Sequence, residues 1–222
     1  MNLFKNVKKT KVGYTFVNDA TLKALNRPPE INNSPNFSCP SIASTNNRIL
    51  SIYPKFSVDF VINIDEHAHY EYEINKKHHR STQQMHDLLL NSILLDSRND
   101  KYHFQLVGDI CFVTDDKELE LFTTVAPNTF TNDCTFINGA FYPYGWIRPL
   151  NSAWEVKDKS KITFDRNVPY MYVIFNKPIE LEYVENKKIK NYLNESYDIT
   201  NYGLGINQFY KNALSRRPKK LL

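Results

Sequence analysis

Glycine and cysteine are scarce in this chain of 222 residues, which holds six glycines and three cysteines. So few glycines leave little room for a loop that cradles phosphate, and the sequence contains no Walker loop, GxGxxG, GxSxG or HExxH. The cysteines, Cys39, Cys111 and Cys134, are far apart and form no CxxC pair. The sequence therefore offers no signature of nucleotide binding, serine hydrolysis or zinc proteolysis, and it predicts neither a zinc ribbon nor a disulfide framework.

Long apolar runs are also missing. A run of about 18 apolar residues, which a membrane-spanning helix needs, occurs nowhere, and the first residues lack the apolar core of a signal peptide. The odd number of cysteines fits a reducing compartment. We therefore expect a soluble protein of a cytoplasm that does not bind membranes.

Positive charge is concentrated at the two ends of the chain. Residues 1–11 contain four lysines, residues 211–222 contain five lysines and arginines, and neither segment contains an acidic residue. Removing these nine charges from the net charge of +4 leaves the body at −5. An acidic body argues against sequence-specific binding of nucleic acid. Solvated basic tails are the simplest interpretation, and contact of the tails with an acidic partner, or with nucleic acid without sequence preference, is the alternative.

Hydrophobic residues make up 41% of the chain and charged residues 23%, which is typical of a folded protein with a core. We expect one domain overall. Residues 1–55 would form an N-terminal arm and a strap rich in proline and asparagine, because four prolines fall within residues 28–40. Residues 56–185 would form a β-sandwich core, and residues 186–222 a C-terminal helical extension with a basic tail.

Alternating hydrophobicity predicts a β-hairpin near the middle of the chain. Residues 56–64, "FSVDFVINI", place aromatic and aliphatic side chains on one face of a strand. Residues 69–75, "HYEYEIN", alternate again, so residues 65–68 are the expected turn.

A helix and further strands are expected after this hairpin. Residues 82–96 have helical spacing behind a capping box of Ser81 and Gln84. Short alternating segments then return, among them "WEVKD" and "KITFDR" on either side of a charged hairpin, "KDKSK". Residues 169–175 are apolar on both faces and should form the central strand. With a short helix at 206–214, the pattern predicts a mainly β fold, an antiparallel β-sandwich or jelly roll with one internal and one C-terminal helix.

Five of the six histidines lie within residues 63–86. His67, His69 and Glu73 have the spacing HxHxxxE, which resembles the first metal motif of the cupins, and "PYGWIR" contains the PxG of the second motif. Cupins are double-stranded β-barrels that often bind iron, manganese or nickel, so the resemblance implies a metal-dependent enzyme. The match fails at three positions, where the motifs have glycine, glycine and histidine and this chain has Val61, Arg80 and Arg148.

The chain geometry gives an independent argument against a metal site. Residues 70–73 alternate between tyrosine and glutamate, and an extended chain would put Glu73 about 13 Å from His69. A metal bond of about 2 Å cannot bridge that separation. We therefore expect no cofactor and a polar strand face, with a divalent transition metal on His67, His69 and either Glu73 or His103 as the alternative.

Residues 138–175 are rich in aromatic side chains. We expect Tyr144, Trp146, Arg148 and Trp154 to form a binding rim, with Arg148 free to pair with a carboxylate or to stack on an aromatic ring. "WIRPLN", "EVKDKSKI" and "NSPNFSCPS" resemble stretches of uncharacterised proteins of tailed bacteriophages, especially marine ones. The resemblance implies a phage source and a host-cell cytoplasm, or a virion, as the location.

Two functional hypotheses follow. The first is a non-enzymatic protein that binds a protein partner, either as an accessory virion component or as a binder of a host protein. The second is a cupin-like metal-dependent enzyme that uses His67 and His69. The sequence favours the first, because it contains no catalytic constellation, and it leaves homo-oligomerisation open.

Overall fold

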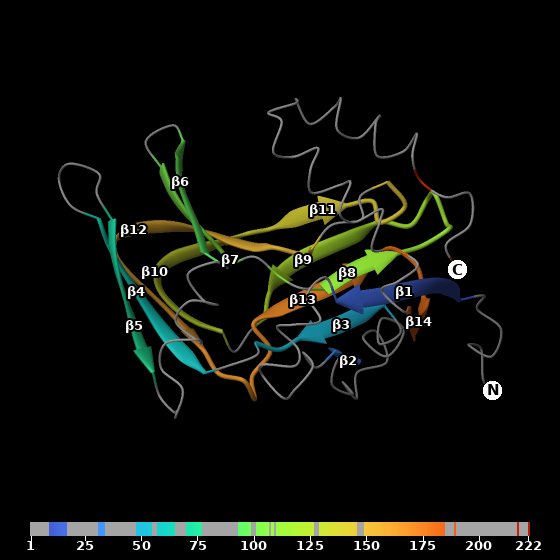
Figure 1. Cartoon of the computed structure of the whole chain (residues 1–222), viewed down its shortest axis with the longest axis horizontal. Coiled ribbons are helices and arrows are strands. Elements are labelled where there is room, and N and C mark those ends of the chain that lie inside the picture. Colours follow the sequence, from blue (N-terminus) through green and yellow to red (C-terminus); the bar gives the residue numbers. More distant parts are fainter. Residues whose placement is uncertain are drawn as a thin grey trace, which may run out of the picture.

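The computed structural model describes residues 9–16, 31–33, 48–54, 57–64, 70–76, 93–98, 101–106, 108, 110–126, 129–145, 149–184, 189, 217 and 222. These residues form three open β-sheets and contain no helix, which confirms the expected mainly β class (Figure 1). Every strand pair is antiparallel except β1 with β14, which is parallel. The helices and hairpins expected from the sequence can therefore be compared with the observed strands wherever the structure describes those residues.

Two of the sheets lie toward the end of the molecule that holds the chain's C-terminus (Figure 1). The three-stranded sheet has the order β14 (Ile179–Tyr183), β1 (Thr10–Phe16) and β8 (Ile110–Val113). The five-stranded sheet has the order β11 (Gly139–Phe141), β9 (Leu121–Val125), β13 (Met171–Phe175), β3 (Ile49–Ile52) and β2 (Ile31–Asn33). The segment expected to be the central strand thus contains β13, which is the middle strand of this sheet.

The six-stranded sheet is organised around the long strand β12 (Ser152–Phe164). Its order is β5 (Tyr70–Lys76), β4 (Val58–Ile64), β12, β7 (Lys101–Leu106) and β6 (Ile93–Arg98), and β10 (Phe130–Ile137) also pairs with β12. β7 pairs with the first half of β12 and β4 with the second half. The hairpins β4–β5 and β6–β7 therefore branch from different halves of one strand.

The predicted hairpin of residues 56–64 and 69–75 is confirmed. β4 and β5 are antiparallel, and their register runs from Ile64 opposite Tyr70 to Val58 opposite Lys76. The inward face is also as expected, since Val58, Phe60 and Ile62 have no exposed surface.

The expected helix over 82–96 is wrong at its C-terminal end. Residues 93–96 belong to β6, which pairs with β7 in a hairpin from Ile93 opposite Leu106 to Arg98 opposite Lys101. The aliphatic run in this segment satisfies helical and strand spacing alike, and pairing with β7 decides between them. The rest of that helix and the expected helix at 206–214 lie outside the described residues.

The hairpin expected at "KDKSK" is also wrong, because β12 runs through it without reversing. Along β10, Asn132 faces Lys161 and Cys134 faces Val156, so Asp133 alone faces four residues of β12. Ser160 stabilises this bulge: its hydroxyl accepts the amide of Lys157 at 2.8 Å and lies 2.8 Å from the carbonyl oxygen of Asp133, to which it can donate. Asp133 has a φ of 54°, a left-handed conformation that aspartate tolerates better than most residues. The extra residues of β12, 157–160, therefore form a bulge within the strand and not a hairpin turn.

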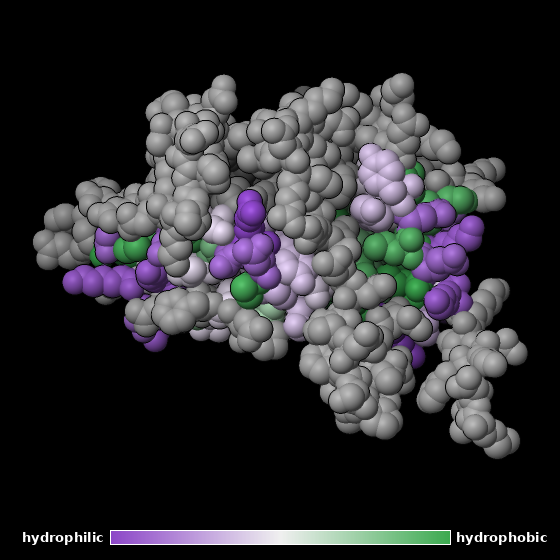
Figure 2. Space-filling model, turned by 90° about the horizontal axis from the view of Figure 1, so that it is seen from below, coloured by the Kyte–Doolittle hydropathy of each residue, from purple (hydrophilic) through white to green (hydrophobic). Residues whose placement is uncertain are grey.

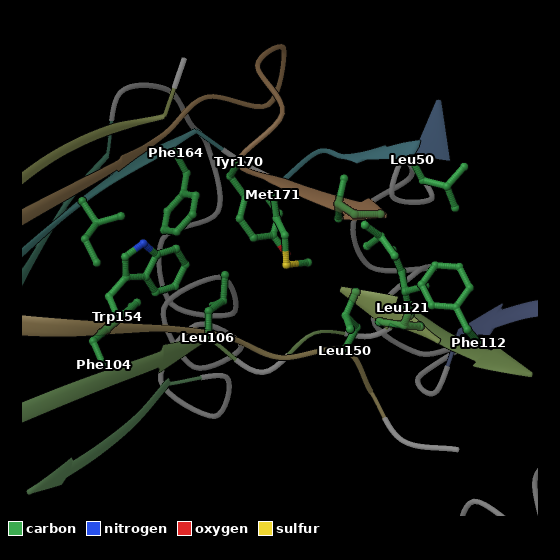
Figure 3. Packing of buried hydrophobic residues seen from close by; sticks show 14 of the residues in the cluster. Leu50, Phe104, Leu106, Phe112, Leu121, Leu150, Trp154, Phe164, Tyr170 and Met171 are labelled. Atoms are coloured by element: carbon green, nitrogen blue, oxygen red, sulfur yellow. The ribbon is translucent and has the colours of Figure 1, made fainter. Parts of the chain in front are cut away.

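One hydrophobic cluster contains residues from all three sheets, such as Val12, Phe60 and Met171. Trp154 lies within it, with ring centroids 5.3 Å from Phe136, 5.6 Å from Phe104 and 5.7 Å from Phe164. Figure 3 shows Trp154 between Phe104 and Phe164, with Leu121 and Phe112 at the other end of the core. The three sheets therefore share buried apolar contacts.

Candidate functional site

The turn at residues 114–118, "TDDKE", gathers the densest set of described polar contacts, at the end of β8. The hydroxyl of Thr114 is fully buried, donates to the carbonyl of Lys11 at 3.1 Å and accepts the amide of Asp116 at 3.1 Å. Asp116 in turn accepts the amide of Glu118 at 2.9 Å. A threonine and an aspartate that bind nearby amides are typical of tight turns, so this sequence fixes the local shape of the turn.

The second oxygen of Asp116 points toward the turn between β13 and β14. It lies 2.9 Å from Nζ of Lys177 and 3.3 Å from the hydroxyl of Thr10. Partial burial by itself raises the pKa of Asp116, but the hydrogen bonds from Lys177 and from the Glu118 amide outweigh it and hold the pKa below its usual value. The same hydrogen bond to Asp116 raises the pKa of Lys177, which also contacts Glu118 at 3.1 Å. Both groups stay charged at neutral pH.

Asp115 binds the C-terminal segment of the chain. One carboxylate oxygen lies 2.9 Å from Nη2 of Arg217, and the other accepts the amide of Leu222 at 3.0 Å. Arg217 also donates to the carbonyl of Thr114 and lies over the ring of Tyr144, 3.9 Å from its centroid. The side chain of Arg217 is 2% exposed, so the expectation of a solvated basic tail is wrong for this residue.

The predicted rim residues do not form one surface. Trp154 has no exposed area, which corrects its expected place on a rim: an alternating strand buries one of its faces, and Trp154 is on the buried face. Tyr144 is half-buried, with Arg217 on its ring and Nζ of Lys117 5.6 Å from the centroid. Trp146 and Arg148 lie outside the described residues.

The predicted metal ligands are placed only in part. His67 and His69 lie outside the described residues, and Glu73 belongs to β5, whose extended backbone is the premise of the distance argument above. His103 lies in β7 between Asp96 and Glu155 in register, whereas Glu73 faces Val61 of β4. Within the part of the chain that the structure describes, no three His, Cys, Asp or Glu side chains are grouped so that they could hold a metal ion.

Apart from these polar residues, an apolar row lies on the outer face of the five-stranded sheet. Phe122 lies opposite Ala140 of β11 and Ile174 of β13, and Ile174 lies opposite Ile49 of β3. Phe122 is 40% exposed, and two large side chains next to β11, Ile137 and Tyr142, are 41% and 49% exposed. The sequence contained a signal for this row, because the alternation of "ELELFTTVA" puts Phe122 on the face opposite Leu119 and Leu121.

Apolar side chains also reach the surface at a second place, near β1 and β14. Figure 2 shows hydrophobic side chains next to hydrophilic ones at the end of the molecule where Figure 1 places β1, β3 and β14. Tyr183 of β14 is 54% exposed, and its ring meets that of Tyr14 edge to face at 5.6 Å. Exposed aromatic side chains therefore occur on two separate sheets.

Comparisons with known proteins give no further information about the site, since no family model, curated protein or solved structure matches the chain. The described residues include no helix long and apolar enough to cross a membrane. The site must therefore be interpreted from its own residues.

Proposed function

We propose that this protein works through contacts with another protein and not through catalysis. The observation that carries the proposal is the apolar row on the outer face of the five-stranded sheet, together with the exposed Tyr142 beside it. We call the row of Phe122, Ala140 and Ile174, together with the exposed side chains of Ile137 and Tyr142 on either side of β11 in the sequence, the contact face.

The chemistry of the contact face suits a protein partner. Aromatic side chains supply large buried areas at low entropic cost, and tyrosine also offers a hydroxyl for a hydrogen bond. For these reasons aromatic residues, tyrosine among them, are frequent at the energetic centres of interfaces. The polar groups of the 114–118 turn are instead largely used inside the molecule: Asp115, Asp116 and Lys177 each bind a partner of the same chain. The apolar row is the described surface whose side chains most resemble the centre of an interface.

The wider assignment rests on sequence features. We propose a single-domain β-sandwich in which the open sheets pack face to face, of phage origin, that acts in the host cytoplasm as a binder of a host protein or as an accessory virion component. The segments that resemble phage proteins and the aromatic content support this assignment. We propose no metal cofactor, because residues 70–73 lie in the extended strand β5, as the distance argument for His69 and Glu73 assumes.

A crosslinking experiment tests the contact face. A photoreactive phenylalanine analogue is placed at Tyr142 and, in a matched control, at Tyr183, which is an exposed tyrosine of another sheet. We expect one protein to crosslink from position 142 and not from 183, and Phe122→Ser to weaken binding of that purified protein at least tenfold while Tyr183→Ser leaves it unchanged.

Two outcomes would contradict parts of the proposal. Equal crosslinking from both positions, or equal effects of the two serine variants, would remove the contact face. Detection of the protein in infected cells but not in purified virions, by mass spectrometry, would remove the virion version and leave a host-protein binder.

A further inference from the structure

The way Arg217 is buried points to a built binding site. Its guanidinium has three kinds of partner in the body of the protein: the Asp115 carboxylate at 2.9 Å, the Thr114 carbonyl, and the face of the Tyr144 ring at 3.9 Å. Burying an unpaired charge is costly, so the site is complementary to a cation. A planar guanidinium can stack on a ring while it donates in its own plane, which the ammonium of lysine cannot do. The site therefore specifies arginine.

Leu222 is held at a second, apolar point of the same site. Its amide donates to the other oxygen of Asp115 at 3.0 Å, and its side chain packs against the buried cluster that includes Val113 and Val184. A Cβ at Gly13 would clash with the side chains of Val184 and Val113 and would lie 2.8 Å from Cδ2 of Leu222, so the missing side chain leaves room for all three. Figure 1 places the end of the chain beside β1 and β8, which supply Gly13 and Val113.

Both anchors lie within six residues of sequence, and one carboxylate serves both of them. All the described contacts of the segment are therefore carried by a short peptide and do not depend on how that peptide is connected to the rest of the chain. We propose that Gly13, Val113, Thr114, Asp115, Tyr144 and Val184 form a peptide-binding socket. Its occupants are the chain's own Arg217 and Leu222, the two described anchors of a releasable clasp that a free peptide with the same arginine and leucine can replace.

The socket joins parts of two sheets. Gly13, Val113 and Asp115 belong to β1, β8 and the turn after β8, in the three-stranded sheet, whereas Tyr144 follows β11 of the five-stranded sheet. Arg217 bridges the two, so release of the clasp removes this bridge and leaves the contact of Lys117 with the Tyr144 ring as the remaining described link. This inference is argued from other residues than those of the proposed contact face.

A peptide-rescue experiment tests the socket in the full-length chain. The clasp is disabled by the double substitution Arg217→Ala and Leu222→Ser, and Arg166→Ala removes an exposed arginine as a control of equal charge. We expect the melting temperature of the double variant to fall by at least about 4 °C and that of the control to stay within about 1 °C of the unmodified chain. A peptide of residues 214–222 at millimolar concentration should restore at least half of the loss.

The control peptide carries Arg217→Ala and retains the other three basic residues of the segment, so it measures nonspecific attraction to the acidic body. Rescue by the natural peptide and not by the control supports the socket. An unchanged melting temperature in the double variant, or equal rescue by both peptides, would overturn it.

A second measurement needs no variant and therefore does not depend on folding of the double variant. Hydrogen exchange of the C-terminal segment is followed by mass spectrometry in the unmodified chain with each peptide added. The natural peptide should accelerate exchange at least threefold over the control peptide, because it displaces the clasp. Equal exchange with the two peptides would refute replacement of the clasp in trans.

Discussion

Replacing Trp154 by alanine should be among the most destabilising single changes in the described core. The side chain has no exposed area and meets three aromatic rings at centroid distances of 5.3 to 5.7 Å. Truncating a buried tryptophan costs about 3–5 kcal/mol, which for a chain of this size corresponds to a fall in melting temperature of roughly 6–20 °C. Thermal unfolding followed by circular dichroism measures this shift. Tyr142→Ala, which removes an exposed aromatic ring, should cost less than about 1 kcal/mol.

Trp154→Phe separates packing from hydrogen bonding at the same position. The indole N–H of Trp154 is buried and has no hydrogen-bond partner among the residues that the structure describes, and an unsatisfied buried donor costs about 1–3 kcal/mol. Phenylalanine keeps one aromatic ring and removes that donor, so the loss of volume is offset and the variant should be destabilised by less than about 1.5 kcal/mol. Equal destabilisation by alanine and phenylalanine would refute the hydrogen-bond argument. An alanine effect no larger than that of Tyr142→Ala would refute the buried position and return Trp154 to a surface rim.

Three other predictions concern the turn, the strand faces and the histidines. Asp116 has a lowered pKa, so its contribution to stability is present above the ordinary carboxyl pKa and is lost as the pH falls through the lowered value. Lys177→Ala removes the main cause of that lowering and should therefore make the melting temperature fall less steeply as the pH is lowered. An unchanged acid part of the plot of melting temperature against pH would contradict the ion pair. Phe60→Asp puts a charge on the buried face of β4 and should cost several kcal/mol, at least about 3, in denaturant unfolding, so an unchanged midpoint would mean that the faces are reversed. Elemental analysis of protein purified without chelators should find no stoichiometric iron, manganese, nickel or zinc; about one metal per chain that disappears with His67→Ala and His69→Ala would promote the enzyme hypothesis.

The strands that sequence analysis predicted well are those whose two faces differ in polarity. β4 alternates between Val58, Phe60 and Ile62 on the buried face and polar side chains such as Asn63 on the other, and a shift of one residue would reverse every side chain. The β4–β5 hairpin was predicted for the same reason. β6 was not, because consecutive leucines fit a helix and a strand equally well, and its pairing with β7 is not visible in its own spacing.

Longer-range features needed information that lies far away in the chain. "KDKSK" resembles a hairpin turn locally, but β10 pairs on both sides of it and Ser160 fixes the extra residues as a bulge. Trp154 was placed on a rim because the aromatic residues of this region were treated as one surface, although alternation along β12 assigns it to the inner face. The contact face was not predicted, although the alternation of "ELELFTTVA" puts Phe122 on the face opposite Leu119 and Leu121.

The C-terminal segment shows most clearly where local sequence reasoning ends. A run of basic residues without acids is most often solvated, and nothing near Arg217 in the sequence distinguishes it from its neighbours. Its partner Asp115 is 102 positions away, in a turn whose paired acidic residues also suggest solvent exposure. Each half is unremarkable alone, and only the fold brings guanidinium, carboxylate and the Tyr144 ring together. The same carboxylate binds Leu222, so a peptide must present both groups in the correct spacing. Because that requirement is geometric, the exchange of one arginine in an otherwise equally basic peptide is sufficient to distinguish a specific socket from general attraction to an acidic body.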